Sequence, residues 1–181
     1  MVLYNATQDR YIHIKILFNI SMVCLENIAS ISLRTVLNNY GVELQHVAKH
    51  SDIPHSFWGA PEAGRINNQL YARFDTPVHS ILHESFHFVC MPKNQRSLNN
   101  IDAAGSVAEE NATCYLQILL SDQIEAFSRA IHMKDMDAWG YSFRLGSATI
   151  WFRQDAEDAR NWLQSHNIID QHSHITWKLR Q

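Results

Sequence analysis

Two prolines, Pro77 and Pro92, enclose the stretch of sequence that most constrains the fold. Thr76 precedes the first proline, and this pair is typical of a helix start, because a threonine hydroxyl can cap a helix and proline tolerates the first helical position. The second proline cannot continue a helix, since it lacks a backbone N–H and clashes with the preceding turn. The sequence therefore predicts a helix from residue 77 to about residue 91.

This predicted helix contains the pattern HExxH, as His83-Glu84-Ser85-Phe86-His87. Histidines four residues apart share one face of a helix, so both imidazoles can reach a single metal ion. Glu84 projects to the side of that pair, where it can take a proton from a metal-bound water. The pattern predicts a metal site with His83 and His87 as ligands and Glu84 as the general base. A helix with two incidental histidines is the alternative interpretation.

A catalytic metal usually has three protein ligands and one open position, so a third ligand is expected. The segment from Glu109 to Thr113 begins 22 residues after His87 and lies on a predicted helix from 106 to 120. In this arrangement the chain resembles the gluzincin metallopeptidases, in which HExxH is followed by a glutamate in a helical ExxA(D/N) pattern. The resemblance implies that Glu109 is the third ligand, and Glu110 is the alternative.

The same resemblance implies roles for two further residues on that helix. Ala112 takes the place of the small residue that lets the two helices approach each other. Thr113 takes a position often held by aspartate or asparagine, where it could accept a hydrogen bond from a ligating histidine but brings no charge. The likeness covers residues 68 to 120, and by analogy the strand 69–74 would be a sheet edge that pairs with an extended substrate.

The periodicity of apolar residues and the length of 181 residues predict one α+β domain, 1–181. The resemblance implies a zincin-like version of that class: a small mixed sheet packed on the HExxH helix and on a glutamate-bearing helix, with further C-terminal helices. Besides the two helices named above, we expect helices at 21–40 (with Gly41 as its cap), 121–132 and 154–166, strands at 42–47, 69–74, 142–152 and 175–179, and a loop between 48 and 68.

Composition excludes several classes of partner. Fifteen basic and 18 acidic side chains are scattered along the chain, without the basic stripe that nucleic acid requires. No apolar run approaches the length of about 20 residues that spans a bilayer, and the start of the sequence lacks the pattern of a secretory signal. Three cysteines without CxxC spacing favour reduced, buried thiols. We therefore expect a cytoplasmic protein that contacts neither nucleic acid nor membrane.

Three functions are compatible with these residues. The first is a zinc metallopeptidase that acts on a peptide or protein substrate, with Zn²⁺ as its cofactor and Glu84 as the base. The second is a non-haem Fe²⁺ oxygenase, since two histidines and one carboxylate also form the ligand set of such enzymes. The HExxH helix is in addition similar to that of the elongation factor P hydroxylases, which read HExSH. The third is a metal-binding protein without catalysis.

Several other polar residues could take part in such a site. His79 lies one turn before His83 and continues the histidine face of the helix. His172 and His174 alternate in a polar stretch, a pattern typical of exposed side chains that bind metal only adventitiously. A hydrolase needs a donor that stabilises the oxyanion. Four residues are chemically able to do so: Tyr71, Arg73, His132 and Tyr141.

Overall fold

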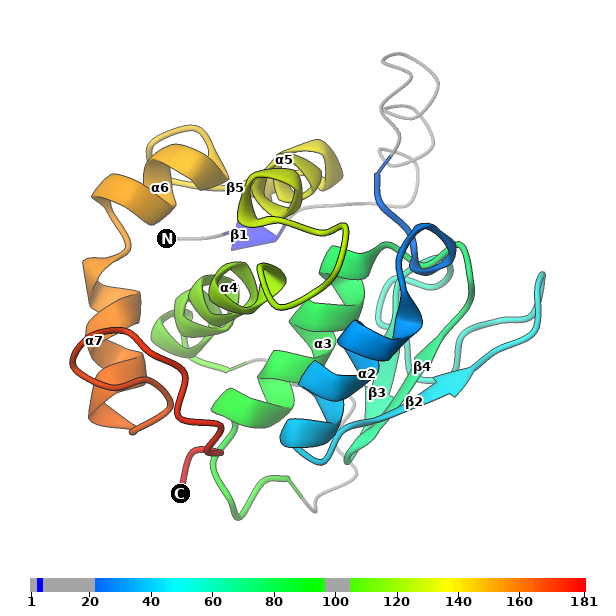
Figure 1. Cartoon of the computed structure of the whole chain (residues 1–181), viewed down its shortest axis with the longest axis horizontal. Coiled ribbons are helices and arrows are strands. Elements are labelled where there is room, and N and C mark those ends of the chain that lie inside the picture. Colours follow the sequence, from blue (N-terminus) through cyan, green and yellow to red (C-terminus); the bar gives the residue numbers. More distant parts are fainter. Residues whose placement is uncertain (1–2, 5–21, 97–104) are drawn as a thin grey trace.

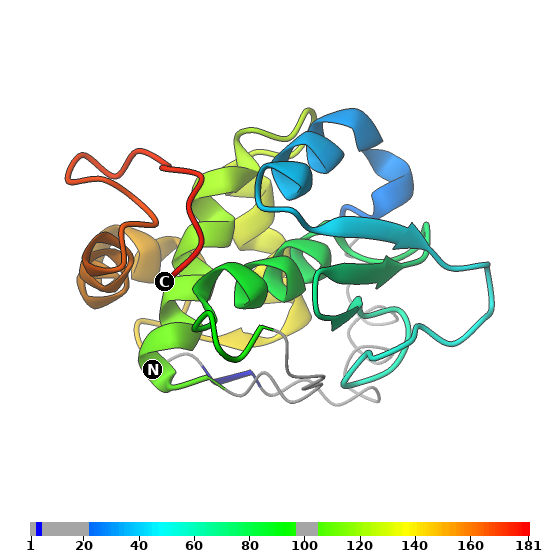
Figure 2. The ribbon, with the colours of Figure 1, turned by 90° about the horizontal axis from the view of Figure 1, so that it is seen from below.

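The computed structural model describes residues 3–4, 22–96 and 105–181. These residues form an α+β fold, in which helix α3 (Val78–Cys90) lies between a small sheet on one side and helix α4 (Val107–Ser121) on the other (Figures 1 and 2). The α+β class predicted from the sequence is confirmed. The other described elements are β1 (Leu3–Tyr4), η1 (Leu25–Asn27), α2 (Ser30–Asn39), β2 (Glu43–His46), β3 (Gly64–Ile66), β4 (Gln69–Ala72), α5 (Arg129–Trp139), β5 (Tyr141–Ser142), α6 (Ala148–Gln154) and α7 (Glu157–Ser165).

The main sheet has three strands in the order β2-β4-β3, and β1 pairs with β5 in a separate two-stranded sheet. β2 runs parallel to β4, with Glu43 opposite Gln69, whereas β3 runs antiparallel to β4, with Ile66 opposite Gln69. Strand 69–74 was expected at an edge, and this expectation is wrong, because β4 is the central strand. The two edge strands are β2 and β3, and β3 lies in the region that was expected to be a loop.

A tight turn explains the additional strand. Only Asn67 and Asn68 separate β3 from β4, and Asn67 has a left-handed backbone with φ of 51°. Asparagine tolerates that conformation better than most residues, which makes it common in hairpin turns of two residues. Next to the turn, a side chain at Gly64 would overlap the carbonyl oxygen of Pro54. Glycine at this position lets the preceding loop pack against the edge strand.

Helix α3 has the predicted extent and is buried along nearly its whole length. It ends at Cys90, before Pro92, as expected. Its start differs in detail: Pro77 precedes the first helical residue, and the Thr76 hydroxyl accepts a hydrogen bond from the Arg73 backbone N–H (3.0 Å) and does not cap the helix. The first helical N–H, that of Val78, donates instead to the carbonyl of Val23 (2.9 Å).

Helix α4 also matches its predicted extent and has a capped start. The Ser106 hydroxyl accepts a hydrogen bond from the backbone N–H of Glu109 (3.3 Å). Serine is a preferred residue at this position, because its oxygen satisfies an amide that has no partner within the helix. Ala112 is fully buried on α4, and α4 packs closely against α3. The start of α4 is therefore held next to the HExxH helix.

The C-terminal third departs most from expectation. Instead of a helix over 121–132, the chain turns after α4, and Ser128 caps α5, which begins at Arg129. The predicted strand 142–152 is wrong beyond β5, because Ser147 caps helix α6 there. Residues 175–179 contribute a single bridge between Ile169 and Ile175 and no strand. The helix predicted at 21–40 is present in shorter form as α2, and a left-handed Gly41 follows it; residue 21 lies outside the described residues. The helix predicted at 154–166 is present in shorter form as α7.

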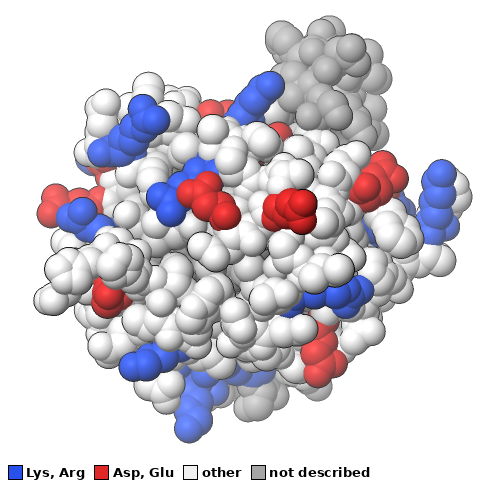
Figure 3. All heavy atoms as spheres, in the orientation of Figure 1, with Lys and Arg blue, Asp and Glu red and all other residues white. Residues whose placement is uncertain are grey.

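The charged side chains on the face shown in Figure 3 are dispersed, with lysine and arginine interspersed among aspartate and glutamate. On this face they form no continuous basic stripe. Among the described helices, none is long and apolar enough to cross a membrane.

Candidate metal centre

The two histidines of HExxH point to the same place from one face of α3. The Nε2 atoms of His83 and His87 lie 3.0 Å apart, and their side chains are only 7% and 10% exposed. The predicted meeting of these imidazoles is therefore present in the structure. Burial, with smaller contributions from His83 and Arg65, holds the pKa of His87 well below its usual range. A neutral imidazole keeps the lone pair that a metal ion requires.

Glu110 of α4 faces this histidine pair. One of its carboxylate oxygens lies 3.4 Å from Nε2 of His83, and the other lies 3.4 Å from Nε2 of His87. Glu109, which the resemblance placed here, contacts the guanidinium of Arg180 instead (3.2 Å). The structure thus brings Glu110 to the histidines and directs Glu109 elsewhere. Neighbouring residues on a helix point about 100° apart, so only one of the two glutamates can face α3 directly.

The spacing of these donor atoms fits one small divalent cation. Nitrogen and oxygen ligands lie about 2.0–2.2 Å from a tetrahedral zinc ion, which places them about 3.3 Å from one another. Each imidazole nitrogen lies 3.4 Å from a different carboxylate oxygen of Glu110, which is close to that spacing, and the 3.0 Å between the two imidazole nitrogens is slightly shorter. Two imidazole nitrogens and one carboxylate also provide the donor types that zinc and iron bind in proteins. The residues present therefore fit such an ion.

Glu84 lies beside the histidine pair and is partly buried. Burial, together with the nearby charges of Glu62 and Glu110 and against the opposing charge of Arg65, raises the pKa of the Glu84 carboxyl group to about 8. Arg65 lies on β3, Glu110 on α4, and Glu62 in the loop that precedes β3. A carboxyl group with such a pKa can hold and release a proton near neutral pH, as a general acid or base requires.

Cys114 is a metal-capable group that the sequence reasoning did not assign to the site. It lies one turn after Glu110 on α4, and its thiol donates a weak hydrogen bond to a carboxylate oxygen of Glu110 (3.8 Å). Together with His83 and Glu110 it forms a second group of closely spaced donors. Burial raises the pKa of this thiol well above its usual range, so it remains protonated. The spacing of four residues from Glu110 was the available signal in the sequence.

Arg65 and Glu62 were also missed. Both side chains are almost fully buried, and both influence the pKa of Glu84. Arg65 donates to the carbonyl of Asn67 (2.9 Å) and packs over the ring of Phe88 on α3. Its position depends on the β3–β4 hairpin, whose first strand lies in the segment that was expected to be a loop. A buried arginine beside a predicted strand was the signal.

Behind the histidine pair lie two more histidines that are fully buried, His79 and His132. Burial lowers the pKa of His132 to about 3 and that of His79 well below its usual range, with His83 adding to both shifts. The ring of Tyr141 contacts those of His79 and His83 edge to face, at 5.9 and 5.6 Å. Of the four residues named as oxyanion donors, His132 and Tyr141 therefore lie near the site.

The remaining predicted residues lie apart from this centre or have other partners. Arg73 forms an ion pair with Asp75 (2.8 Å), and Tyr71 packs against the ring of His55. Thr113 is fully buried, and its hydroxyl has no hydrogen-bond partner among the described residues. His172 and His174 both donate backbone N–H groups to Asp170, in an exposed part of the chain. The three cysteines are free, and Cys90 and Cys114 are buried as expected, whereas Cys24 is partly exposed.

Comparisons of this chain with protein-family models, with curated proteins and with solved structures found no match.

Proposed function

We propose that this protein is a metal-dependent hydrolase, most simply a zinc metallopeptidase, in which His83, His87 and Glu110 hold one ion. The observation that carries the proposal is the convergence of two imidazole nitrogens and one carboxylate from two packed helices, with each nitrogen 3.4 Å from one oxygen of that carboxylate. Glu110 replaces Glu109 as the proposed ligand, because its carboxylate contacts both histidines. The proposed architecture is zincin-like, with α3 as the active-site helix.

A Zn²⁺ ion bound there would polarise a substrate carbonyl and lower the pKa of a bound water. Glu84 would accept the proton of that water and deliver it to the leaving group. Glu84 lies beside the histidines, whereas Glu110 makes the contacts of 3.4 Å with both imidazoles. This arrangement supports a role for Glu84 in proton transfer. Tyr141 and Arg65 lie near the histidines and Glu84, and either could donate a hydrogen bond to a developing oxyanion. The proposed substrate is a peptide or protein in the cytoplasm.

The first experiment is metal analysis of protein purified without a histidine tag, followed by a peptide-library screen. We expect about one equivalent of zinc per chain and cleavage that a chelator abolishes and added Zn²⁺ restores. Protein that holds no divalent ion after incubation with Zn²⁺, Fe²⁺ or Co²⁺ would overturn the proposal. Stoichiometric metal without turnover of any peptide would favour a metal-binding protein that has no catalytic activity.

An oxygenase is the second candidate, because the same donor groups are compatible with it. The side chains that meet at the candidate site are two histidines and one carboxylate. Non-haem oxygenases bind Fe²⁺ with the same set of ligands. Repeating the screen with Fe²⁺-loaded protein, aerobically and anaerobically, distinguishes the two reactions. Turnover that requires both Fe²⁺ and oxygen would replace the hydrolase by a hydroxylase or related oxygenase.

A further inference from the structure

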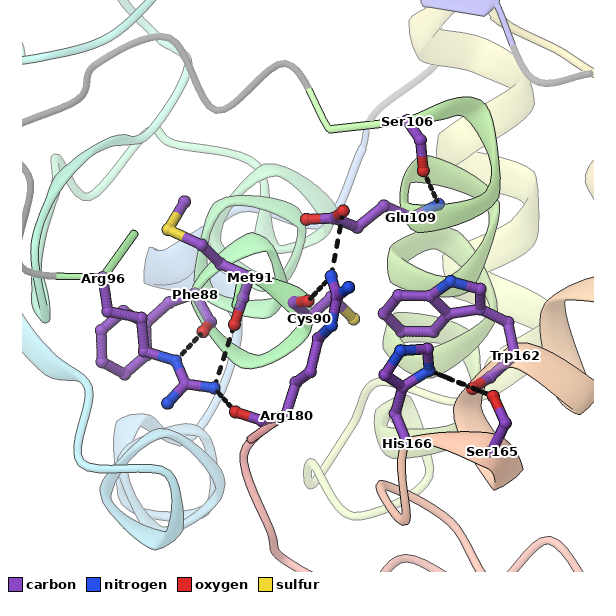
Figure 4. A network of polar contacts seen from close by, with 10 residues as sticks. All are labelled: Phe88, Cys90, Met91, Arg96, Ser106, Glu109, Trp162, Ser165, His166 and Arg180. Carbon is purple, nitrogen blue, oxygen red and sulfur yellow. Dashed lines mark hydrogen bonds and ion pairs between the residues drawn. The ribbon is translucent and has the colours of Figure 1, made fainter. Parts of the chain in front are cut away.

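A second polar network, next to the proposed metal ligands, joins three parts of the chain that are distant in sequence (Figure 4). The Arg180 guanidinium donates to the carboxylate of Glu109 at the start of α4 (3.2 Å) and to the carbonyl of Cys90 at the end of α3 (3.1 Å). Its backbone N–H donates to the carbonyl of Val89 (3.1 Å). Arg180 therefore links the C-terminal end of α3 to the N-terminal turn of α4.

The arginine itself is held in place from two sides. Its guanidinium lies over the ring of Trp162 on α7, with 5.0 Å to the ring centre, and its carbonyl accepts a hydrogen bond from Arg96. The side chains of Arg180 and Glu109 are 21% and 15% exposed, so their ion pair is largely shielded from solvent. Removing one member of such a pair leaves the other as an uncompensated charge in a partly buried place.

We propose that Arg180 and Glu109 form a positioning pair that holds the first turn of α4 so that Glu110 faces His83 and His87. This inference rests on the proposed metal site, and it names the residues that position the ligand Glu110. Glu109 and Glu110 are adjacent on α4, so only one of them can face α3 directly. Arg180 engages Glu109, so one carboxylate is neutralised and directed away while the other remains free to act as a ligand. Neither Arg180 nor Glu109 touches the ion in this scheme.

The test measures Co²⁺ and Zn²⁺ affinity by chelator competition for the wild type, Arg180→Ala, Arg180→Lys, Glu109→Gln and the double variant Glu109→Gln/Arg180→Ala. Loss of a group that supports a metal ligand typically lowers affinity about 10- to 100-fold. We expect such a loss in Arg180→Ala and in Glu109→Gln, and a smaller one in Arg180→Lys, which keeps the charge. The double variant should bind the metal no more weakly than the weaker-binding single variant, because both substitutions remove the same contact.

Two further measurements separate positioning from general stability. Arg129→Ala is the matched control, since Arg129 pairs with Asp122 at the opposite end of α4 (2.8 Å) and lies apart from Glu109; its metal affinity should equal that of the wild type. The visible absorption of the Co²⁺-loaded protein reports ligand geometry, so it should change in Arg180→Ala and stay unchanged in Arg129→Ala. If Arg180→Ala does not fold, Arg180→Lys and Glu109→Gln still give both measurements.

The outcomes distinguish this inference from the proposed function. Wild-type affinity in Arg180→Ala would overturn the positioning pair and leave the metal site intact. Loss of affinity in Glu109→Gln alone would identify Glu109 as a ligand and also overturn the inference. Independent, multiplying losses in the double variant would show that the two residues act separately and reject the pair. A wild type that binds no metal would overturn the proposed function itself, together with the inference.

Discussion

Glu84 is the residue whose substitution best separates the proposed reactions. Glutamine has nearly the same shape but cannot accept a proton, so Glu84→Gln should keep the metal and the fold. General-base catalysis contributes about 10²- to 10⁴-fold, and peptide turnover should fall by that factor at equal metal content. The measurement is the rate of peptide cleavage, with metal content checked for each preparation. Oxygen-dependent turnover that survives Glu84→Gln would contradict the hydrolase.

The proposed ligands should behave differently from their neighbours. Replacing His83, His87 or Glu110 by alanine leaves two protein ligands, which hold a metal weakly. We expect each of these variants to lose its metal during dialysis against a mild chelator. His79→Ala is the control, because His79 lies on the same helix one turn from His83 and is not among the closest donors. Near-stoichiometric metal in the three ligand variants would rule out the site.

Asp135 on α5 is a buried carboxylate that should make stability depend on pH. Its Oδ2 accepts the backbone N–H of Val23 (2.9 Å), and burial raises the pKa of the carboxyl group from 3.8 to about 6. A raised pKa in the folded state means that this group contributes stability below about pH 4. That contribution is lost as the pH rises through about 6 and amounts to at most about 3 kcal/mol.

The variant Asp135→Asn keeps an acceptor for Val23 but has no charge. The free energy of unfolding of the wild type should therefore fall relative to that of the variant between pH 4 and pH 7. Urea denaturation at several pH values measures this difference. A constant difference over the whole range would contradict the assigned titration.

The choice between Glu109 and Glu110 shows what local sequence could not decide. The HExxH pattern, the proline stops and the apolar spacing sufficed to predict that α3 and α4 would exist and that His83 and His87 would meet. Which adjacent glutamate faces α3 depends on the rotation of α4 about its axis. That rotation involves Arg180, which is 71 residues away from Glu109. A pattern read within one helix contains no information about such a contact.

At the scale of elements, helices with strong end signals were predicted closely and the others were not. The segment 142–152 was expected to be a strand, and its aromatic and β-branched residues are typical of strands. In the structure Ser147 caps a helix there, and Trp151 is buried in the core, so tertiary packing overrides the local preference. The hairpin of β3 and β4 had a readable signal, the turn Asn67-Asn68, but its first strand is only three residues long.

The edge strand β3 should be highly sensitive to substitution at Gly64. A methyl group there would meet backbone atoms of Pro54 and Ser56, which cannot move independently of the loop. We expect Gly64→Ala to lower the free energy of unfolding by about 3 kcal/mol, at the upper end of the usual cost of overpacking. Gly41→Ala is the comparison, since a side chain there meets open space and the cost of about 1 kcal/mol comes from its positive φ alone. A cost for Gly64→Ala no larger than that for Gly41→Ala, measured by urea denaturation, would contradict the close approach.

At the scale of the whole molecule, the proposed metal acts as a cross-link between α3 and α4. A ligand that binds only the folded state stabilises it by about 2.7 kcal/mol at a free concentration 100 times its Kd. For a chain of this size that corresponds to a rise in Tm of about 5–10 °C. Thermal unfolding with and without Zn²⁺ measures the shift. His83→Ala should show none, and an equal shift in that variant would mean that the metal binds elsewhere.

The contacts of Arg180 also bear on how quickly a bound ion could leave. Its backbone N–H donates to Val89, and these partners on α3 and α4 lie 71 to 91 residues away in sequence. Because residues 176–181 form no helix or strand, we expect this segment to open while α3 and α4 remain folded. Such local openings have lower free energies than global unfolding. Hydrogen exchange at the Arg180 amide would therefore report the opening that frees Glu109. The lifetime of the bound ion would follow the fraying of a peripheral segment and would be independent of the lifetime of the folded core.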